Sequence, residues 1–425
     1  MPPRDIYPSA ANLSTCRSRC TACGPDIDTP PARSRRFDPP LFYLEASGAL
    51  DHRPLLSAVL STLASRPPDV VWPVGEGQYL IEPPILRALA THPRRTLDAE
   101  RARIHVLCVA PWASLLLARR RGEPEAHAER MAAAARELAG LRRFTHSRRA
   151  GRLYVQLLGG ESLATLGKEY QRELASGNVV LGCTDPTNAY IGPNNREPAH
   201  RLMATAITLP YLSHAFAAMP FAGHGPRSGL MFHGGLGRFD FGNRDRMRKI
   251  LLRVPSVAAH TKVPTDVRIA EFTRGNNTAL RRAFNVSEYE SSGMAYKKAS
   301  ICMVPAGDVL SSRRLFDALS AGCVPLLLRS WYLLNKNGQT FYSALPFPNS
   351  VKWEDITLRL VPSYSSLACI DGDARWLVGW HNSSLERMRR KGHSAFLRYM
   401  DYSNPEGVAS ALLDEAAIRQ QARHL

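Results

Sequence analysis

The residues best suited to chemistry lie in one short stretch, residues 299–328, which reads ASICMVPAGDVLSSRRLFDALSAGCVPLLL. An apolar run ends at Pro305, and a loop containing Gly307 follows it. Ser312 then stands where a helix would begin, and serine is favoured there because its hydroxyl can accept a hydrogen bond from a free backbone N–H group. This order predicts a buried strand, a tight loop and the start of a helix.

The charged residues at this helix start predict a site for a nucleotide diphosphate. The first turn of a helix offers free N–H groups and a partial positive charge to an anion. Arg313 and Arg314 add guanidinium groups that can grip phosphate oxygens in pairs. Asp317, one turn further on, can accept hydrogen bonds from ribose hydroxyls. The same residues also fit an ordinary capped helix with a surface Arg–Asp pair.

The elements that must position these residues alternate along the chain. Apolar runs of strand length are separated by helical patterns, which predicts parallel, doubly wound sheets whose ligands bind beyond the carboxyl ends of the strands. The expected strands are residues 69–74, 102–110, 153–158, 178–183, 229–233, 266–272, 299–304 and 324–328. The expected helices are residues 55–64, 123–143, 244–254, 287–298, 311–321 and 407–424.

The length of 425 residues predicts two domains, because single cores rarely grow beyond roughly 250–300 residues. Residues 1–40 are rich in Pro, Arg and Ser and indicate a flexible leader or stem. Residues 219–228 (MPFAGHGPRS) contain several turn formers and indicate a linker. We therefore expect an N-terminal domain over residues 41–220 and a C-terminal domain over residues 221–425, closed by the last helix.

The stretch that could do chemistry resembles the exostosin-type glycosyltransferase family, whose members are inverting enzymes. The likeness is strong over residues 296–356 and weaker over residues 40–400. It implies the α/β architecture called GT-B, in which two Rossmann-like domains face each other across a cleft. The matching residues are Ser300, Cys302, Pro305, Gly307, Ser312, Arg314, Leu315, Asp317, Ala318, Gly322, Cys323, Val324, Pro325, Leu345, Pro346, Phe347 and Trp353.

The resemblance also implies a reaction. The C-terminal domain would hold a nucleotide sugar, expected to be UDP-linked, and the N-terminal domain would face a glycan or glycoprotein acceptor. No metal or other cofactor is expected to be obligatory. The donor sugar stays open, as does the formation of homo- or hetero-oligomers with related transferases. The residues expected to bind the nucleotide are Ser312, Arg313, Arg314, Asp317, Gly307 and Gly234.

The catalytic base is expected at Asp185. Many members of the family carry a His-Asp-x-Gly sequence after an N-terminal strand, and residues 184–187 (TDPT) follow that strand here without the His and the Gly. Asp185 also fits an Asp-Pro turn. The missing residues leave a second hypothesis, a catalytically silent protein that binds polyanions or glycans on the same fold. Asp371 and Asp373 form a DxD triplet, which would instead suit a metal-dependent GT-A enzyme.

The formal charge of +18 does not by itself predict binding of nucleic acid. The chain has 47 Arg and only 8 Lys, a ratio that a GC-rich coding sequence produces without selection for an anionic partner. Nucleic acid is therefore not an expected partner. A composition of 44% hydrophobic and 22% charged residues excludes a disordered, collagen-like or coiled-coil chain.

The cysteines fall into groups with different expected chemistry. Residues 16–23 (CRSRCTAC) space three cysteines like ligands of an iron–sulfur cluster, and a disulfide or free thiols in the leader fit them too. Cysteines inside or beside apolar runs are expected to behave as small hydrophobic residues. These are Cys108, Cys183, Cys302 and Cys323.

The cellular location is expected to be the Golgi lumen, by family resemblance. Four N-glycosylation sequons, which begin at Asn12, Asn276, Asn285 and Asn382, agree with a lumenal protein. The sequence has no apolar run of about 18 residues, the length of a membrane-spanning helix. Its first residues also lack the apolar core of a secretory signal. A truncated or soluble form is therefore the expectation.

Overall fold

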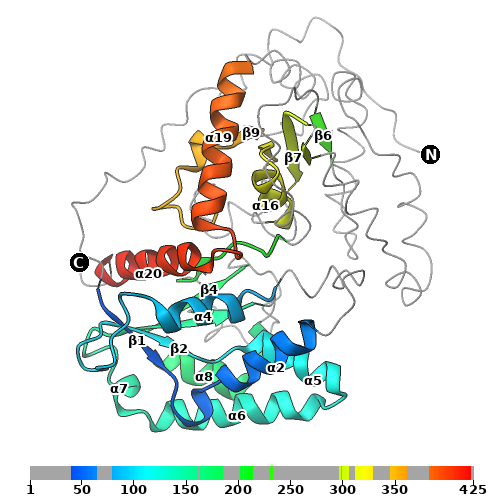
Figure 1. The fold of residues 1–425 in the computed structure, drawn as a ribbon. Helices are drawn as coiled ribbons and strands as arrows, with labels where there is room; N and C mark the ends of the chain where they lie inside the picture. The colour runs from blue at the N-terminus through cyan, green and yellow to red at the C-terminus, as the bar shows by residue number, and fades with distance from the viewer. Residues whose placement is uncertain are drawn as a thin grey trace, which may run out of the picture.

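The computed structural model describes residues 40–64, 79–159, 163–184, 202–203, 205–213, 230–232, 296–297, 299–305, 312–328, 345–360 and 382–422. These residues form two parallel sheets with helices packed on them (Figure 1). None of the helices described is both long enough and apolar enough to cross a membrane.

The first sheet has the strand order β1-β2-β3-β4-β5, and all of its neighbouring strands run parallel. Every residue of β2, β3 and β4 is buried, as expected for strands of a parallel sheet that is covered on both faces. The strands are β1 (Phe42–Glu45), β2 (Ile104–Leu107), β3 (Leu153–Leu158), β4 (Val179–Cys183) and β5 (Ile207–Thr208).

Helices cover both faces of the first sheet (Figure 1). One face packs against α2 (Arg53–Ala64), α4 (Glu82–Thr91) and α5 (Pro111–Arg121). The other face packs against α6 (Pro124–Gly140), α7 (Arg142–Thr145) and α8 (Lys168–Ser176), with the 3-10 turns η3 (Gly48–Leu50) and η4 (Leu163–Leu166). Proline suits the first position of α5, and Gly122 ends that helix with a φ of 72°.

The second sheet has the order β6-β7-β8-β9 and is also parallel. Its strands are β6 (Leu230–Phe232), β7 (Ile301–Pro305), β8 (Val324–Leu328) and β9 (Leu358–Leu360). The helix α16 (Arg313–Ser320) connects β7 to β8, and α19 (Asn382–Tyr399) packs on α16. A 3-10 turn, η6 (Trp353–Asp355), precedes β9.

The last helix, α20 (Pro405–Ala422), packs on α4 and on strands of the first sheet as well as on α19. In Figure 1 it lies between α19 and α4. Its buried residues belong to a hydrophobic cluster that also contains side chains of both sheets and of α16. The two sheets are therefore joined through one core, and the C-terminal helix is shared between them.

The predicted α/β class is confirmed, and the two parallel sheets are those expected of a GT-B arrangement. The expected strands over 102–110, 153–158, 178–183, 229–233, 299–304 and 324–328 are present, as are helices over 55–64, 311–321 and 407–424. The expected helix over 123–143 is divided, because Leu141 adopts an extended conformation between α6 and α7. The domain boundary stays a prediction, since residues 214–229 lie outside the described residues.

Several expected features lie outside the described part of the chain. These are most of the leader over 1–40, the strands over 69–74 and 266–272, the helix over 244–254, most of the helix over 287–298, the linker over 219–228, the cysteines of 16–23, and the Asp371–Asp373 triplet. Four described helices, α4, α5, α8 and α19, were not among the expected elements.

Candidate functional site

The candidate site is built around the start of α16. Because β7 and β8 are parallel neighbours, the helix between them runs back along the sheet, and its first turn lies at the carboxyl edge of β7. Ser312 precedes the helix with extended backbone angles, and its carbonyl oxygen accepts a hydrogen bond from the Leu315 N–H at 2.9 Å. Gly322, with a φ of 67°, follows the end of the helix as predicted.

The Ser312 hydroxyl makes no hydrogen bond to the helix that it precedes. The hydroxyl is buried, and none of the described residues is its partner. Buried polar groups normally have a hydrogen-bond partner. A buried, unsatisfied hydroxyl beside a helix N-terminus is a group that a ligand oxygen can satisfy.

Arg313 and Arg314 occupy the first turn of α16, and both are partly exposed. The Arg313 Nε atom lies 3.4 Å from Oδ2 of Asp317. Asp317 is buried, and its Oδ1 accepts a hydrogen bond from the Ser213 hydroxyl at 2.7 Å. Burial raises the pKa of Asp317, although Arg313 and Ser213 act in the opposite direction. The carboxylate thus connects α16 to the chain that follows β5.

The other predicted site residues lie outside the described residues. Gly307 and Gly234 follow β7 and β6, and Asp185 follows β4. Thr184, the last described residue before Asp185, is buried, and its hydroxyl donates a hydrogen bond to the Gly159 carbonyl at 3.4 Å. The chain therefore leaves the first sheet toward Asp185 at the carboxyl edge of that sheet.

The last of the residues that resemble the exostosin-type family form part of the core. Leu345, Phe347 and Trp353 are buried in the cluster that joins the two sheets. The indole N–H of Trp353 donates a hydrogen bond to the Pro346 carbonyl at 2.8 Å. Phe347 adopts a φ of 50°, a left-handed conformation that is costly for a bulky residue.

Two cysteines among the residues that resemble the exostosin-type family do not behave as predicted. Cys302 and Cys323 are joined by a disulfide, with their Cα atoms 5.9 Å apart. Expecting them to be small hydrophobic residues was wrong, because only the pairing of β7 with β8 brings the two thiols together. Cys108 and Cys183, in contrast, are buried as predicted and are not part of a disulfide. The disulfide closes the loop that carries α16.

A buried carboxylate at the carboxyl edge of the first sheet was not predicted. Glu82, at the start of α4, accepts hydrogen bonds from the backbone N–H groups of Trp112 at 3.0 Å, Ala113 at 2.9 Å and Gly159 at 2.8 Å. Burial raises the pKa of Glu82 to about 7, against the effect of the three donors. No local sequence pattern predicts these contacts of Glu82, because its partners are 30, 31 and 77 positions away.

Aromatic rings connect this edge of the first sheet to α16. The Tyr79 ring lies 5.4 Å from Trp112 and 5.6 Å from Tyr211, measured between centroids. Tyr211 in turn lies 6.1 Å from Phe316 on α16. The carboxyl edge near Glu82 and α16 are therefore parts of one packed region.

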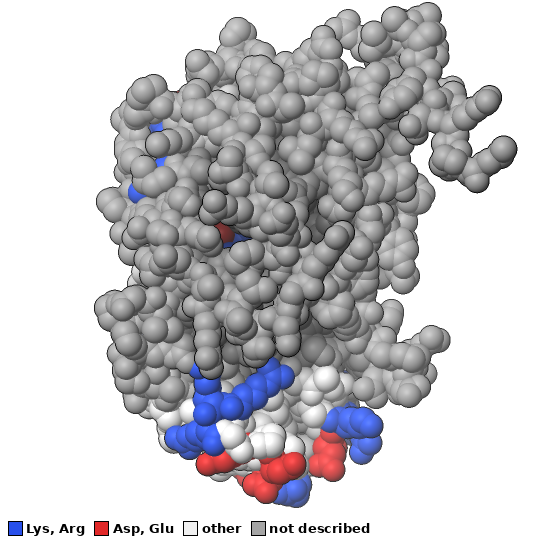
Figure 2. Space-filling model, turned by 90° about the vertical axis from the view of Figure 1, so that its right-hand side faces the viewer, with Lys and Arg blue, Asp and Glu red and all other residues white. Residues whose placement is uncertain are grey.

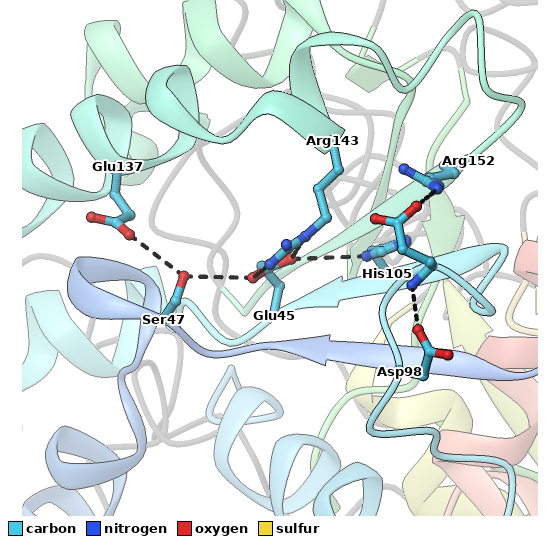
Figure 3. Close-up of polar contacts among 8 residues, drawn as sticks. Glu45, Ser47, Asp98, His105, Glu137, Arg143 and Arg152 are labelled. Atoms are coloured by element: carbon cyan, nitrogen blue, oxygen red, sulfur yellow. Dashed lines mark hydrogen bonds and ion pairs between the residues drawn. The ribbon is translucent and has the colours of Figure 1, made fainter.

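A second polar cluster lies on the face of the first sheet covered by α6, α7 and α8. Figure 3 shows Arg143 reaching Glu45, with His105 on the other side of the carboxylate. Arg143 donates two hydrogen bonds, at 2.9 and 2.7 Å, and His105 Nδ1 lies 3.8 Å away. Burial alone would raise the pKa of Glu45, but His105 and Arg143 hold it below its ordinary value. This cluster fastens α7 to β1.

The surface shown in Figure 2 does not carry one continuous basic area on its described part. Blue and red side chains lie next to each other at the lower end of that face. Within the described residues, no group of three or more His, Cys, Asp or Glu side chains is arranged to hold a metal ion.

Residues 230–363 match the family model of the Exostosin GT47 domain. The match contains β6, β7, α16, β8 and the buried Leu345–Trp353 segment, so the resemblance seen in the sequence is confirmed over this stretch. No curated protein matches the chain. One similar solved structure is entitled "Crystal structure of GtfA/B complex", with 11% identity, a TM-score of 0.31, and coverage of 62% of this chain and 57% of that one. The chain is therefore similar to exostosin-type glycosyltransferases over residues 230–363.

Proposed function

We propose that the chain is an inverting glycosyltransferase that transfers a sugar from a UDP-linked donor to a glycan or glycoprotein acceptor. The start of α16 supports this proposal most directly. It lies at the carboxyl edge of a parallel sheet inside the matched domain, and it presents an unsatisfied buried hydroxyl and two arginines. The backbone N–H groups of a helix start, a hydroxyl and guanidinium groups together suit a diphosphate.

In the proposed reaction, an acceptor hydroxyl oxygen bonds to the anomeric carbon while the bond from that carbon to the diphosphate oxygen breaks. The hydroxyl proton passes to Asp185, which follows the described residue Thr184 in the sequence. Arg313, Arg314 and the first N–H groups of α16 stabilise the negative charge on the departing diphosphate. With those groups in place, the proposed reaction has no obligatory metal.

In this proposal Asp317 positions the start of α16. Its carboxylate is held by Ser213 at 2.7 Å and faces Arg313 at 3.4 Å, so it orients the first turn of α16 relative to the first sheet. Its predicted contact with ribose hydroxyls stays a prediction.

We place the reaction in the Golgi lumen. The Cys302–Cys323 disulfide supports this location, because disulfides persist in oxidising compartments. The four sequons agree with it.

Binding of UDP tests the proposal. We expect UDP to raise the unfolding temperature of the wild-type protein, and we expect Arg314→Ala to weaken UDP binding about tenfold or more through loss of a charged hydrogen bond. Ser312→Ala should weaken UDP binding about two- to tenfold, the range for one neutral hydrogen bond. It should leave the unfolding temperature without UDP unchanged, because the hydroxyl has no partner to lose.

Arg172→Ala, which removes an exposed arginine of α8, is the matched control and should bind UDP like the wild type. The proposal fails if UDP does not stabilise the wild-type protein. It also fails if Arg172→Ala and Arg314→Ala weaken binding equally. If UDP binds as expected, a screen of UDP-sugars with a glycan acceptor would identify the donor as the sugar nucleotide that is consumed.

A further inference from the structure

The residues that follow β5, 209–213, form a connecting segment that passes from the first sheet to α16. The Leu209 N–H donates a hydrogen bond of 2.8 Å to the Cys183 carbonyl at the end of β4. The Tyr402 hydroxyl, in the turn between α19 and α20, donates a hydrogen bond of 2.8 Å to the Pro210 carbonyl. The connecting segment is therefore fixed at its first two residues, before it reaches α16.

Two side chains of the connecting segment contact the first half of α16. The Tyr211 ring lies 6.1 Å from Phe316, measured between centroids, and both residues are buried. The Ser213 hydroxyl, also buried, donates a hydrogen bond of 2.7 Å to Oδ1 of Asp317. A residue that follows the first sheet thus holds a side chain of the helix at the candidate site.

The Asp317 carboxylate divides its two oxygens between the connecting segment and the start of α16. Oδ1 accepts the hydrogen bond from Ser213, and Oδ2 lies 3.4 Å from Nε of Arg313, one turn earlier on the helix. Asp317 is only 4% exposed, so water has little access to replace a lost partner. Burial raises the pKa of Asp317, and both Arg313 and the Ser213 hydrogen bond oppose this shift.

We propose that Ser213 is a positioning residue for the diphosphate of the nucleotide donor, and that it acts through Asp317 on Arg313. The hydrogen bond fixes the orientation of the carboxylate, and the carboxylate fixes the Nε edge of the Arg313 guanidinium. An arginine that is already held in one orientation loses less side-chain entropy on binding phosphate than a mobile arginine does. The affinity of α16 for the donor is therefore set partly from the connecting segment.

This inference rests on the proposed function, because it concerns the same helix start. Titration calorimetry of the full chain with UDP tests both, and the two failures differ. No binding of UDP by the wild type would overturn both. Binding of UDP by the wild type, with equal or higher affinity in Ser213→Ala, would overturn only the role of Ser213.

We expect Ser213→Ala to weaken UDP binding about three- to tenfold, because only part of the free energy of a hydrogen bond to a charged group is passed on to Arg313. Ser213→Thr keeps the hydroxyl and should bind UDP like the wild type. Ser147→Ala is the matched control, since it removes another buried hydroxyl, which accepts a hydrogen bond of 3.0 Å from the Asn178 N–H. It should lower the unfolding temperature and leave UDP affinity unchanged.

The variant Arg313→Ala shows whether Ser213 acts through the arginine. Ser213→Ala should cause no further loss of UDP affinity in that background, because effects of residues that act in series do not add. Equal losses in the wild-type and Arg313→Ala backgrounds would overturn the proposal. Losses in Ser147→Ala or Ser213→Thr as large as the loss in Ser213→Ala would also overturn it.

Hydrogen exchange supplies a second measurement that a purely structural role of Ser213 would not affect. If the contact between Ser213 and Asp317 strengthens UDP binding, UDP must strengthen that contact in return. We expect UDP to slow the exchange of backbone amides in residues 209–213 of the wild type, and to have no such effect in Ser213→Ala. Exchange in the wild type that does not respond to bound UDP would contradict the coupling.

Discussion

At the scale of single residues, Glu82 combines complete burial with three backbone donors. Its ordinary pKa of 4.5 rises to about 7 in the folded protein because burial disfavours the charged carboxylate. The folded protein therefore keeps a proton that the unfolded chain releases between these two pH values. The stabilising contribution of this proton is fully present below pH 4.5 and is lost as the pH rises through 7.

We expect the free energy of unfolding of the wild type to fall by about 3 kcal/mol relative to Glu82→Gln between pH 4.5 and 7. The steepest change should approach about 1.4 kcal/mol per pH unit, the value for one proton. Denaturant unfolding at several pH values measures this difference. Glu125→Gln, which removes an exposed glutamate of α6, should keep the wild-type pH dependence. A difference between wild type and Glu82→Gln that stays constant with pH would contradict the assignment.

At the scale of elements, the Cys302–Cys323 disulfide joins β7 to the residue before β8 and closes the loop containing α16. The two cysteines are 21 positions apart, and closing a loop of this size stabilises a fold by about 3 kcal/mol. Because α16 lies inside the closed loop, the disulfide also limits how far the first turn of α16 can move from the carboxyl edge of β7.

We expect a reducing agent to lower the unfolding temperature of the wild-type protein by several degrees more than that of the double variant Cys302→Ala/Cys323→Ala. The double variant is the control for effects of reduction at other cysteines. Alkylation before reduction, followed by peptide mass spectrometry, should leave Cys302 and Cys323 unlabelled. Labelling of both thiols in the native protein would show that the bridge is absent.

At the scale of the whole molecule, α20 holds the two sheets together. On one side, Arg94 lies 2.7 Å from Asp414 and donates a hydrogen bond to the Ser410 carbonyl at 3.1 Å. On the other side, the buried Glu415 accepts two hydrogen bonds of 2.8 Å from Asn349. Burial raises the pKa of Glu415, which Asn349 partly offsets. The parts of the chain that form the two sheets should therefore unfold together.

We expect scanning calorimetry to record one cooperative transition, because both sheets share one core. Glu415→Ala should lower stability by about 2 kcal/mol, since it removes two hydrogen bonds from Asn349 to a buried carboxylate. Asp414→Ala is the neighbouring control and should cost less than about 1 kcal/mol, because that carboxylate is 46% exposed. Two separated transitions, only one of which shifts in Glu415→Ala, would show that the two sheets unfold independently.

The sequence by itself determined the local features. Ser312 and Gly322 predicted the limits of α16, and apolar runs predicted most of the described strands, because caps and periodicity depend on residues within a few positions of each other. The hallmark from Ser300 to Trp353 predicted the family in the same way. The interpretation of the basic excess also needed only the ratio of Arg to Lys.

The tertiary structure alone decided which distant groups meet. It paired Cys302 with Cys323, placed Ser213 against Asp317 from 104 positions away, and placed α20 on the first sheet as well as on α19. It also buried Glu82 among three N–H groups of two other segments. Such contacts form when packed elements bring together residues that have no local relation in the chain. Their partners, and hence the charge state and role of each side chain, follow from the packing and not from the sequence pattern.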